Sequence, residues 1–349
     1  MKAVILHGGQ GTRLRPLTHT GPKQLIKIAG KPISQWGIDA LRALGVKDFC
    51  IILGDNGADR VVDHYGDGSK LGVNITYVYQ GKARGLADAV HRAQPFVGDD
   101  NFVVYLGDNV VLDGLDQVTA EGDYNAVLLA RVPNPTRFGV ALIEGGSIVK
   151  LVEKPREPIS DLALVGVYRF TPEVFQIIEQ LEPSWRGELE ITDAIQHLID
   201  SGKQVRFKVI EGWWKDTGTP DDLLEANRTL LDRYAATSLK TQTQTSKIEG
   251  RVTVGEDSKI IGSTLRGPTY VGRGCTIKDS FIGPYTSLGD GVQIEGCEVS
   301  NSLILDGASI QHTKITDSII GANAKIYRKT TKPTGSKLVV GENSELALD

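Results

Sequence analysis

A glycine-rich loop with two arginines follows the first apolar run of the chain, residues 3–6. The loop is Gly8-Gly9-Gln10-Gly11-Thr12-Arg13-Leu14-Arg15-Pro16. Glycines let the backbone turn with positive φ and bring several N–H groups close to an anion. The loop lacks the Gly-Lys-Ser/Thr ending of a Walker loop, and Leu14 stands where a dinucleotide fingerprint has its third glycine. With Arg13 inside it, the loop indicates a phosphate site of another kind.

Five further blocks follow in order and complete a pattern. They are Pro22-Lys23, Leu106-Gly107-Asp108-Asn109, Val152-Glu153-Lys154-Pro155, Gly187-Glu188-Leu189-Glu190-Ile191-Thr192-Asp193 and Trp213-Trp214-Lys215-Asp216-Thr217-Gly218. With this pattern the chain resembles the sugar-1-phosphate nucleotidylyltransferases, particularly the long form of the glucose-1-phosphate thymidylyltransferases. The resemblance implies an enzyme that joins a nucleoside triphosphate to a sugar 1-phosphate and releases pyrophosphate.

The resemblance assigns the reacting end of the site to two cations and two carboxylates. Arg13 would hold the β- and γ-phosphates, because a guanidinium grips phosphate bidentately and stays charged at any relevant pH. Lys23 would contact the reacting phosphates as a mobile point charge. Asp108 and Asp216 match the metal-binding positions of the family, and Mg²⁺ takes one or two carboxylates together with phosphates and water. We therefore expect Mg²⁺ as the cofactor, held by Asp108 and Asp216.

The resemblance divides the remaining site residues between two substrates. The nucleotide would be bound by Gly8, Gly9, Gly11, Thr12, Gln80 and Gly85. The amide of Gln80 matches the O4 and N3–H edge of a pyrimidine, and Gly85 would leave room for the ring. The sugar phosphate would be bound by Asn109, Gly139, Glu153, Lys154, Val165 and Arg186. Glu153 would accept hydrogen bonds from sugar hydroxyls, while Lys154 neutralises the phosphate. The expected substrates are dTTP and glucose 1-phosphate.

Composition and charge narrow the class of partners. The chain has 349 residues, 40% of them hydrophobic and 23% charged, which is enough for a sizeable core and two domains. A formal net charge of -4 provides no general basic field for nucleic acid, so anionic substrates must be met by local Arg and Lys clusters. Three scattered cysteines indicate a reducing cytoplasm, and no stretch is typical of a signal peptide or a membrane span. We expect a cytoplasmic protein without nucleic-acid or membrane partners.

Strand-like and helix-like segments alternate before residue 110. The predicted strands are residues 3–6, 49–53, 74–80 and 102–106, and the predicted helices are 33–44, 61–65 and 86–93. This order predicts a Rossmann-like α/β fold, with a mixed, mostly parallel sheet and ligands beyond the carboxyl ends of its strands. The glycine-rich loop, Gln80 and Asp108 fall at those ends. We expect this nucleotidylyltransferase domain to span residues 1–236.

From residue 248 the aliphatic residues recur about every six positions. They stand at Ile248, Val254 and Ile260, and again one 17-residue turn later at Leu265, Val271 and Ile277. Three such sides per turn are typical of a left-handed parallel β-helix, in which the aliphatic side chains stack inward. We expect this domain over residues 248–349, after a polar linker at 237–247, with a last strand at Val339-Val340-Gly341. Its flat faces suit self-association, so a homo-oligomer is expected.

Other functions stay open from the sequence. Hexapeptide β-helices often transfer acyl groups, and some relatives join both activities in one chain, for which His312 is the available histidine. A UTP-specific uridylyltransferase is a second alternative. Family members can also keep the fold as regulatory subunits, although the four charged residues assigned above argue against that role. Lys215 stands where short-form relatives carry an apolar residue, so its charge would affect metal binding at Asp216.

Overall fold

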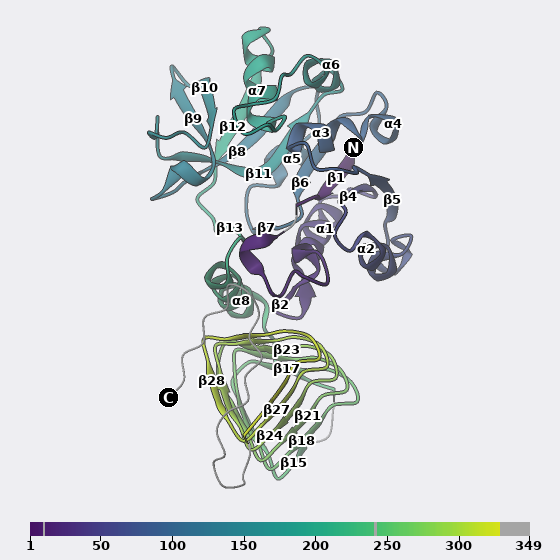
Figure 1. The fold of residues 1–349 in the computed structure, drawn as a ribbon, viewed down its shortest axis with the longest axis vertical. Helices are drawn as coiled ribbons and strands as arrows, with labels where there is room; N and C mark the ends of the chain where they lie inside the picture. The colour runs from purple at the N-terminus through teal and green to yellow at the C-terminus, as the bar shows by residue number, and fades with distance from the viewer. Residues whose placement is uncertain (10, 241–242, 329–349) are drawn as a thin grey trace. The chain divides into compact units, whose positions relative to one another are not determined.

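The computed structural model of the protein describes residues 1–9, 11–240 and 243–328 as two compact units (Figure 1). The first unit comprises Met1–Thr12, Thr20–Ile26 and Lys31–Gly218. The second comprises Arg13–His19, Lys27–Gly30 and the described residues from Thr219 onward. The domain boundaries expected from the sequence, at residues 236 and 248, stay predictions. None of the described helices is long and apolar enough to cross a membrane.

A nine-stranded mixed sheet forms the centre of the first unit. Four strands lie parallel in the order β6 (Phe102–Leu106), β1 (Lys2–His7), β4 (Asp48–Leu53) and β5 (Asn74–Tyr79). The near-continuous apolar runs of β1, β4 and β6 are typical of strands that are buried on both faces, whereas β5 at the sheet edge is partly exposed. The sheet is completed by β8 (Asn125–Arg131), β9 (Gly139–Glu144), β10 (Ser147–Glu153), β11 (Leu162–Phe170) and β12 (Val205–Val209). The predicted α/β fold is confirmed.

Helices pack on both faces of the sheet, because alternate residues of a strand point to opposite sides. Val4 and Leu6 of β1 belong to the core cluster with α3, α6 and α7, whereas Ala3 and Ile5 belong to the cluster with α1 and α2. The helices are α1 (Ile33–Ala43), α2 (Ala58–Tyr65), α3 (Leu86–His91), α4 (Gln94–Val97), α5 (Asp116–Thr119), α6 (Val174–Glu179) and α7 (Ile191–Asp200). The loops at the strand ends are thereby anchored on a rigid core.

A separate two-stranded ladder lies beside the end of β6. Its strands, β7 (Asn109–Val111) and β13 (Trp214–Asp216), pair antiparallel, so that Asp216 faces Asn109. Both strands are three residues long and show no period that sequence inspection would detect. The ladder joins two blocks of the sequence pattern that are about a hundred residues apart in the chain.

The second unit contains α8 (Pro220–Tyr234) and a parallel β-helix. Thr219 caps α8 by accepting a hydrogen bond from Asp222 N, and Pro220 occupies the first turn, where no N–H is needed. One face of the β-helix contains β14 (Ser238–Leu239), β17 (Val252–Val254), β20 (Thr269–Val271), β23 (Thr286–Leu288), β26 (Leu303–Ile304) and β29 (Ile319–Ile320). A second contains β15 (Thr243–Gln244), β18 (Lys259–Ile261), β21 (Thr276–Lys278), β24 (Gln293–Glu295), β27 (Ser309–Gln311) and β30 (Lys325–Tyr327). The third contains β16 (Lys247–Glu249), β19 (Thr264–Arg266), β22 (Phe281–Ile282), β25 (Glu298–Ser300) and β28 (Lys314–Thr316).

The aliphatic repeat of the sequence forms the core of this β-helix. Ile260 pairs with Ile277, and Ile277 with Ile294, so identical positions of successive turns stack. The linker expected at residues 237–247 stays a prediction. Two short strands in this range, β14 and β15, pair with β17 and β18 of the next turn. The strand expected at residues 339–341 lies outside the described residues.

Candidate active site

Asp108 lies between β6 and β7 and forms an ion pair with Lys23. The Lys23 ammonium contacts Asp108 Oδ2, and Asn109 Nδ2 donates a hydrogen bond to Asp108 Oδ1 over 2.9 Å. The side chains of Lys23 and Asp108 are 12% and 19% exposed. Burial by itself raises the pKa of Asp108, but the Lys23 ammonium outweighs this effect and lowers that pKa overall. The carboxylate is therefore ionised at neutral pH.

The ladder of β7 and β13 places Asp216 in the strand that pairs with the segment of Asp108. Asp216 faces Asn109, the residue directly after Asp108. Thr217 extends the ladder, since its N and Oγ1 both donate to Asp108 O over 3.1 and 2.7 Å. Trp214 Nε1 donates to Asn109 Oδ1 over 2.6 Å. The two predicted metal ligands thus come from neighbouring segments, and Trp214 and Thr217 emerge as their supports, although the sequence motif containing them gave no hint of this role.

The carboxylates of Asp108, directly before β7, and of Asp216, in β13, suit a hard divalent cation. Each aspartate offers carboxylate oxygens, which Mg²⁺ prefers over nitrogen or sulfur ligands. The lowered pKa of Asp108 keeps one of these groups charged. Two carboxylates leave the remaining positions of an octahedral ion to substrate phosphates and water. The residues present therefore fit Mg²⁺.

The glycine-rich loop begins directly after β1. Gly9 and Gly11 have φ values of +113° and +59°, which favour glycine. A Cβ at Gly8 would lie 2.9 Å from Gln80 Oε1, so a larger residue there would have to displace the Gln80 amide. Thr12 begins a short 3₁₀ turn, Thr12–Leu14, that contains Arg13. Arg13 belongs to the second unit, and its contact with phosphates stays a prediction.

Gln80 and Gly85 are held by specific neighbours. Gln80 is 7% exposed, and its Nε2 donates to Asp88 Oδ2 over 2.9 Å and to Gly85 O over 3.2 Å. The role of Gln80 in base reading stays a prediction. Gly85 has a φ of +114°, and a Cβ there would lie 2.6 Å from Leu189 N. Close packing against the backbone of Leu189 thus explains why residue 85 is a glycine. This reason differs from the expected one, which was that Gly85 leaves room for the base of the nucleotide.

The predicted sugar residues gather around Glu153 at the end of β10. Glu153 Oε2 accepts a hydrogen bond from Thr192 Oγ1 over 2.6 Å, and its Oε1 lies 3.8 Å from Arg186 Nη1 and 3.5 Å from Lys154 Nζ. A Cβ at Gly139 would lie 3.0 Å from Glu153 Oε2. The structure therefore brings four of the predicted residues together. Thr192, which lies in one of the six sequence blocks without an assigned role, joins this cluster.

Acidic neighbours surround this cluster. Arg186 Nη1 also contacts Glu190 over 3.0 Å. Burial and the charge of Glu153 raise the pKa values of Glu190 and Asp193. Val165 differs from the other predicted sugar residues, because its side chain is buried in the core cluster and only its backbone can face a ligand. The cluster thus combines several carboxylates with two partly exposed cations, Arg186 and Lys154.

His7, at the end of β1, is a buried polar residue that none of the six sequence blocks includes. It is 2% exposed, and neither ring nitrogen has a hydrogen-bond partner among the described residues. A Cβ at Gly107 would lie 2.8 Å from the ring atom Cδ2, so the imidazole packs directly behind the segment of Asp108. Burial lowers the pKa of His7 to about 3.

His7 is expected to make the protein less stable as the pH falls below 6.5. Between pH 6.5 and about 3 the unfolded histidine binds a proton that the folded one does not, so the free energy of unfolding falls by up to about 1.4 kcal/mol per pH unit. This stability is fully present above pH 6.5. Urea unfolding at pH 7, 6 and 5 should show a shallower decline for His7→Gln than for the wild type. An equal decline of the free energy of unfolding in His7→Gln and in the wild type would show that His7 does not cause this pH dependence.

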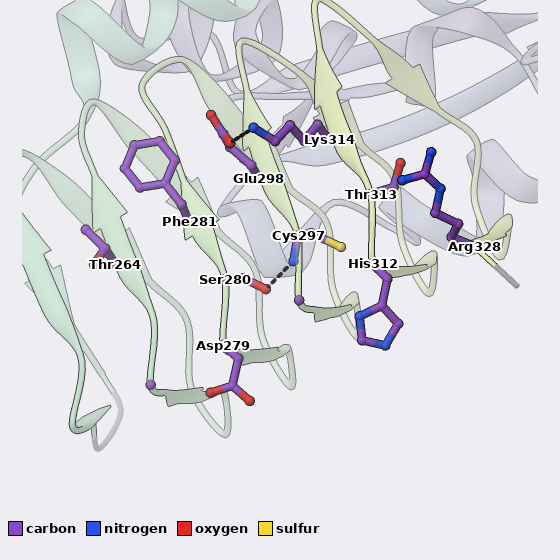
Figure 2. A pocket seen from close by; sticks show the side chains of 12 residues that line it. Thr264, Asp279, Ser280, Phe281, Cys297, Glu298, His312, Thr313, Lys314 and Arg328 are labelled. Atoms are coloured by element: carbon purple, nitrogen blue, oxygen red, sulfur yellow. Dashed lines mark hydrogen bonds and ion pairs between the residues drawn. The ribbon is translucent and has the colours of Figure 1, made fainter. Parts of the chain in front are cut away.

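A groove of about 820 Å³ lies on the β-helix and contains His312 (Figure 2). The other side chains that line it include Asp279, Phe281, Glu298, Lys314 and Arg328. Lys314 and Glu298 form an ion pair over 2.9 Å, and both are mostly exposed. The His312 ring projects from a corner of the turn, where φ is +52°. The histidine of the acyl-transfer alternative thus lies on an open, charged surface rather than in an enclosed site.

Comparisons with known proteins agree with this architecture. Glucose-1-phosphate thymidylyltransferase of Streptomyces antibioticus is 45% identical over 355 residues, which covers all of this chain and 99% of that protein. The low-salt glycan biosynthesis nucleotidyltransferase of Haloferax volcanii is 45% identical over 357 residues, and both chains are covered completely. The crystal structure of a Bacillus anthracis protein, solved with a sucrose and described as a proposed glucose-1-phosphate thymidylyltransferase, matches with a TM-score of 0.61 and 39% identity. It covers 65% of this chain and 94% of that one.

The family comparison covers the part of the chain that contains the predicted site. The model of the nucleotidyl transferase family matches residues 2–233. This range includes the glycine-rich loop, Asp108, Glu153 and Asp216. The resemblance drawn from six sequence blocks is therefore confirmed. With relatives that are 45% identical over its whole length, the chain belongs to the nucleotidyl transferase family.

Proposed function

We propose that this protein is a glucose-1-phosphate thymidylyltransferase that uses Mg²⁺ and makes dTDP-glucose and pyrophosphate. The observation that carries the proposal is the Lys23–Asp108 ion pair, together with the ladder that aligns Asp216 with Asn109. The names of the full-length relatives support the choice of substrates. Three free, buried cysteines (Cys50, Cys275 and Cys297) fit the proposed cytoplasmic location, and the proposed assembly is a homo-oligomer.

The proposed reaction is an in-line displacement. A phosphate oxygen of glucose 1-phosphate attacks the α-phosphorus of dTTP, and the bond from that phosphorus to the oxygen bridging to the β-phosphate breaks. Pyrophosphate leaves with the bonding electrons. Such a transfer needs alignment and charge stabilisation more than covalent help. Lys23 stabilises the charge on the reacting phosphates, and Arg13 holds the β- and γ-phosphates.

The metal would be held by Asp108 and Asp216. When bound, Mg²⁺ neutralises phosphate charge and orients the triphosphate. Asn109 and Thr217 fix the carboxylate and carbonyl of Asp108, so the ligand is preorganised. In the structure Lys23 balances the Asp108 charge, so the partly buried carboxylate has a counter-ion.

Glu153→Gln is expected to weaken the binding of glucose 1-phosphate. The amide keeps the size of the side chain but loses the charge that accepts hydrogen bonds from the sugar hydroxyls, and such bonds contribute about 1.5–3 kcal/mol. The KM for glucose 1-phosphate should rise about tenfold or more, while the KM for dTTP stays within about twofold. Steady-state kinetics with each substrate varied in turn measure both values.

A matched control for Glu153→Gln is Glu173→Gln. Glu173 pairs with Lys203 over 2.6 Å, and its side chain is 51% exposed. This control should leave both KM values unchanged. An unchanged KM for glucose 1-phosphate in the Glu153 variant, or an equal rise for dTTP, would remove Glu153 from the sugar site.

The test of the function is pyrophosphate release across dTTP, UTP, CTP, GTP and ATP, with glucose 1-phosphate and its 2-acetamido analogue as acceptors. The proposal expects dTTP with glucose 1-phosphate to give the highest kcat/KM. Preference for UTP would identify a uridylyltransferase instead. Consumption of acetyl-CoA with an amino-sugar phosphate would support the bifunctional alternative. Release from no nucleotide would favour a regulatory subunit.

A further inference from the structure

Lys27, in the short strand β2 (Lys27–Ile28), forms an ion triad with two aspartates of the β-helix. Its Nζ lies 2.9 Å from Asp290 Oδ2 and 2.8 Å from Asp306 Oδ2. Lys27 is 24% exposed. Burial lowers its pKa, but the hydrogen bonds to Asp306 and Asp290 outweigh this effect and raise it overall. The charged lysine is therefore held between two carboxylates within the second unit.

The two carboxylates are oriented by the turns of the β-helix. Asp290 Oδ1 accepts a hydrogen bond from Arg273 N, and Asp306 Oδ1 accepts one from Asp290 N, both over 2.8 Å. Asp306 stands 17 residues after Gly289, at a turn position where the preceding turns have glycine. The repeat itself does not need an aspartate there. Asp306 thus departs from the repeat at a position where Lys27 binds.

Two further contacts hold the residues after Lys27 within the same unit. Ala29 N donates to Oδ1 of Asn227, a buried residue of α8, over 2.9 Å. A Cβ at Gly30 would lie 2.7 Å from the ring atom Cε1 of Tyr270, so this glycine packs tightly on the ring. Charge, hydrogen bonding and packing therefore all hold the segment Lys27–Gly30 on α8 and the β-helix.

We propose that this ion triad makes Lys27 a positioning residue for nucleotidyl transfer, through which the β-helix restrains the segment that contains Lys23. The inference rests on the proposed function, in which Lys23 contacts the reacting phosphates. Lys23 precedes Lys27 by four positions in the chain, so fixing Lys27 limits the conformations open to Lys23. A misplacement of about 1 Å in a phosphate-binding group can cost on the order of a hundredfold in rate.

The experiment compares Lys27→Met, Lys27→Arg and Asp306→Asn with the full-length wild type. Lys27→Met should lower kcat about tenfold or more, with the KM for glucose 1-phosphate little changed. Lys27→Arg keeps the charge and should recover most of the loss. Asp306→Asn keeps the acceptor for Asp290 N but loses the charge, so it should lower kcat in the same direction. Hydrogen exchange of residues 20–30 should be faster in Lys27→Met than in the wild type.

Lys278→Met is the matched control on the same β-helix. Lys278 pairs with Glu295 over 2.8 Å, on a face that does not hold the segment Lys27–Gly30. Lys278→Met should lower the thermal stability of the protein as much as any general effect of losing an ion pair in Lys27→Met does. It should leave kcat unchanged. Equal kcat values for Lys27→Met and the wild type, or equal losses in the control, would overturn the proposal.

The failure of the proposed function is distinguishable from the failure of this inference. If the wild type releases no pyrophosphate, the proposed function fails. Hydrogen exchange alone then tests whether the ion triad of Lys27 restrains the segment that contains Lys23. Faster exchange of residues 20–26 in Lys27→Met then supports the restraint. Identical exchange in the variant and the wild type overturns it.

Discussion

Asp108→Asn is expected to lower turnover by about a thousandfold, the upper range for losing one preorganised electrostatic group. The amide keeps the shape of the side chain and can still accept one hydrogen bond, but it is a neutral and much weaker ligand for Mg²⁺. The substitution also leaves the partly buried Lys23 ammonium without its counter-ion. We therefore expect the loss to appear in kcat and in a raised Mg²⁺ requirement together.

The measurement for Asp108→Asn is pyrophosphate release in a single turnover over a range of Mg²⁺ concentrations. Circular dichroism and thermal unfolding establish that the variant is folded. Asp63→Asn is a matched control, because Asp63 is an exposed residue of α2. It should retain normal turnover. Near-normal turnover of Asp108→Asn, with an unchanged Mg²⁺ dependence, would show that this aspartate does not hold the ion.

The strands of the first unit were largely predictable, because their apolar runs are nearly continuous. The runs beginning at Ala3, Phe49 and Phe102 all form strands of the parallel part of the sheet. The ladder of β7 and β13 was not predictable in this way. Its strands are too short for a period, and their pairing depends on contacts that are about a hundred residues apart in sequence. The motifs therefore pointed to Asp108 and Asp216 as candidate metal ligands, but only the structure shows which residues support them.

The residues around Glu153 also show that sequence motifs do not reveal the tertiary partners of a side chain. Glu153 and Arg186 were proposed from motifs, yet nothing in the sequence indicated that Thr192 donates to Glu153 or that Glu190 pairs with Arg186. A side chain's partner across the fold depends on tertiary packing, which local patterns do not encode. Gly85 illustrates a related point, since the backbone of Leu189 explains the glycine without any ligand.

The β-helix was predictable because its core repeats along the chain. Inward aliphatic residues such as Ile260 and Ile277 recur at a fixed interval, and each turn buries the same positions. A residue that departs from this repeat has a partner that the repeat does not predict. Asp306 replaces a turn glycine, and its partner Lys27 lies near the other end of the chain. Such a long-range ion pair appears only once the fold is known.

Arg13→Ala is expected to lower turnover at least about a hundredfold without unfolding the protein. Loss of one preorganised charge-stabilising donor costs on the order of 3 kcal/mol in the transition state, which corresponds to about a hundredfold in rate. If Arg13 holds the β- and γ-phosphates, the variant should also bind pyrophosphate more weakly as a product inhibitor. The KM for glucose 1-phosphate should stay near its normal value, because that substrate has neither of these phosphates.

Arg13→Lys separates charge from geometry. A lysine keeps the positive charge but lacks the planar fork that binds two phosphate oxygens at once, so its turnover should fall between those of the wild type and Arg13→Ala. Arg42→Ala is the matched control, since Arg42 donates to Leu71 O at the protein surface. It should leave turnover and pyrophosphate inhibition unchanged. Near-normal turnover of Arg13→Ala would refute the role of Arg13 in phosphate binding. An equal rise in the KM values for dTTP and glucose 1-phosphate would instead point to a structural role for the arginine.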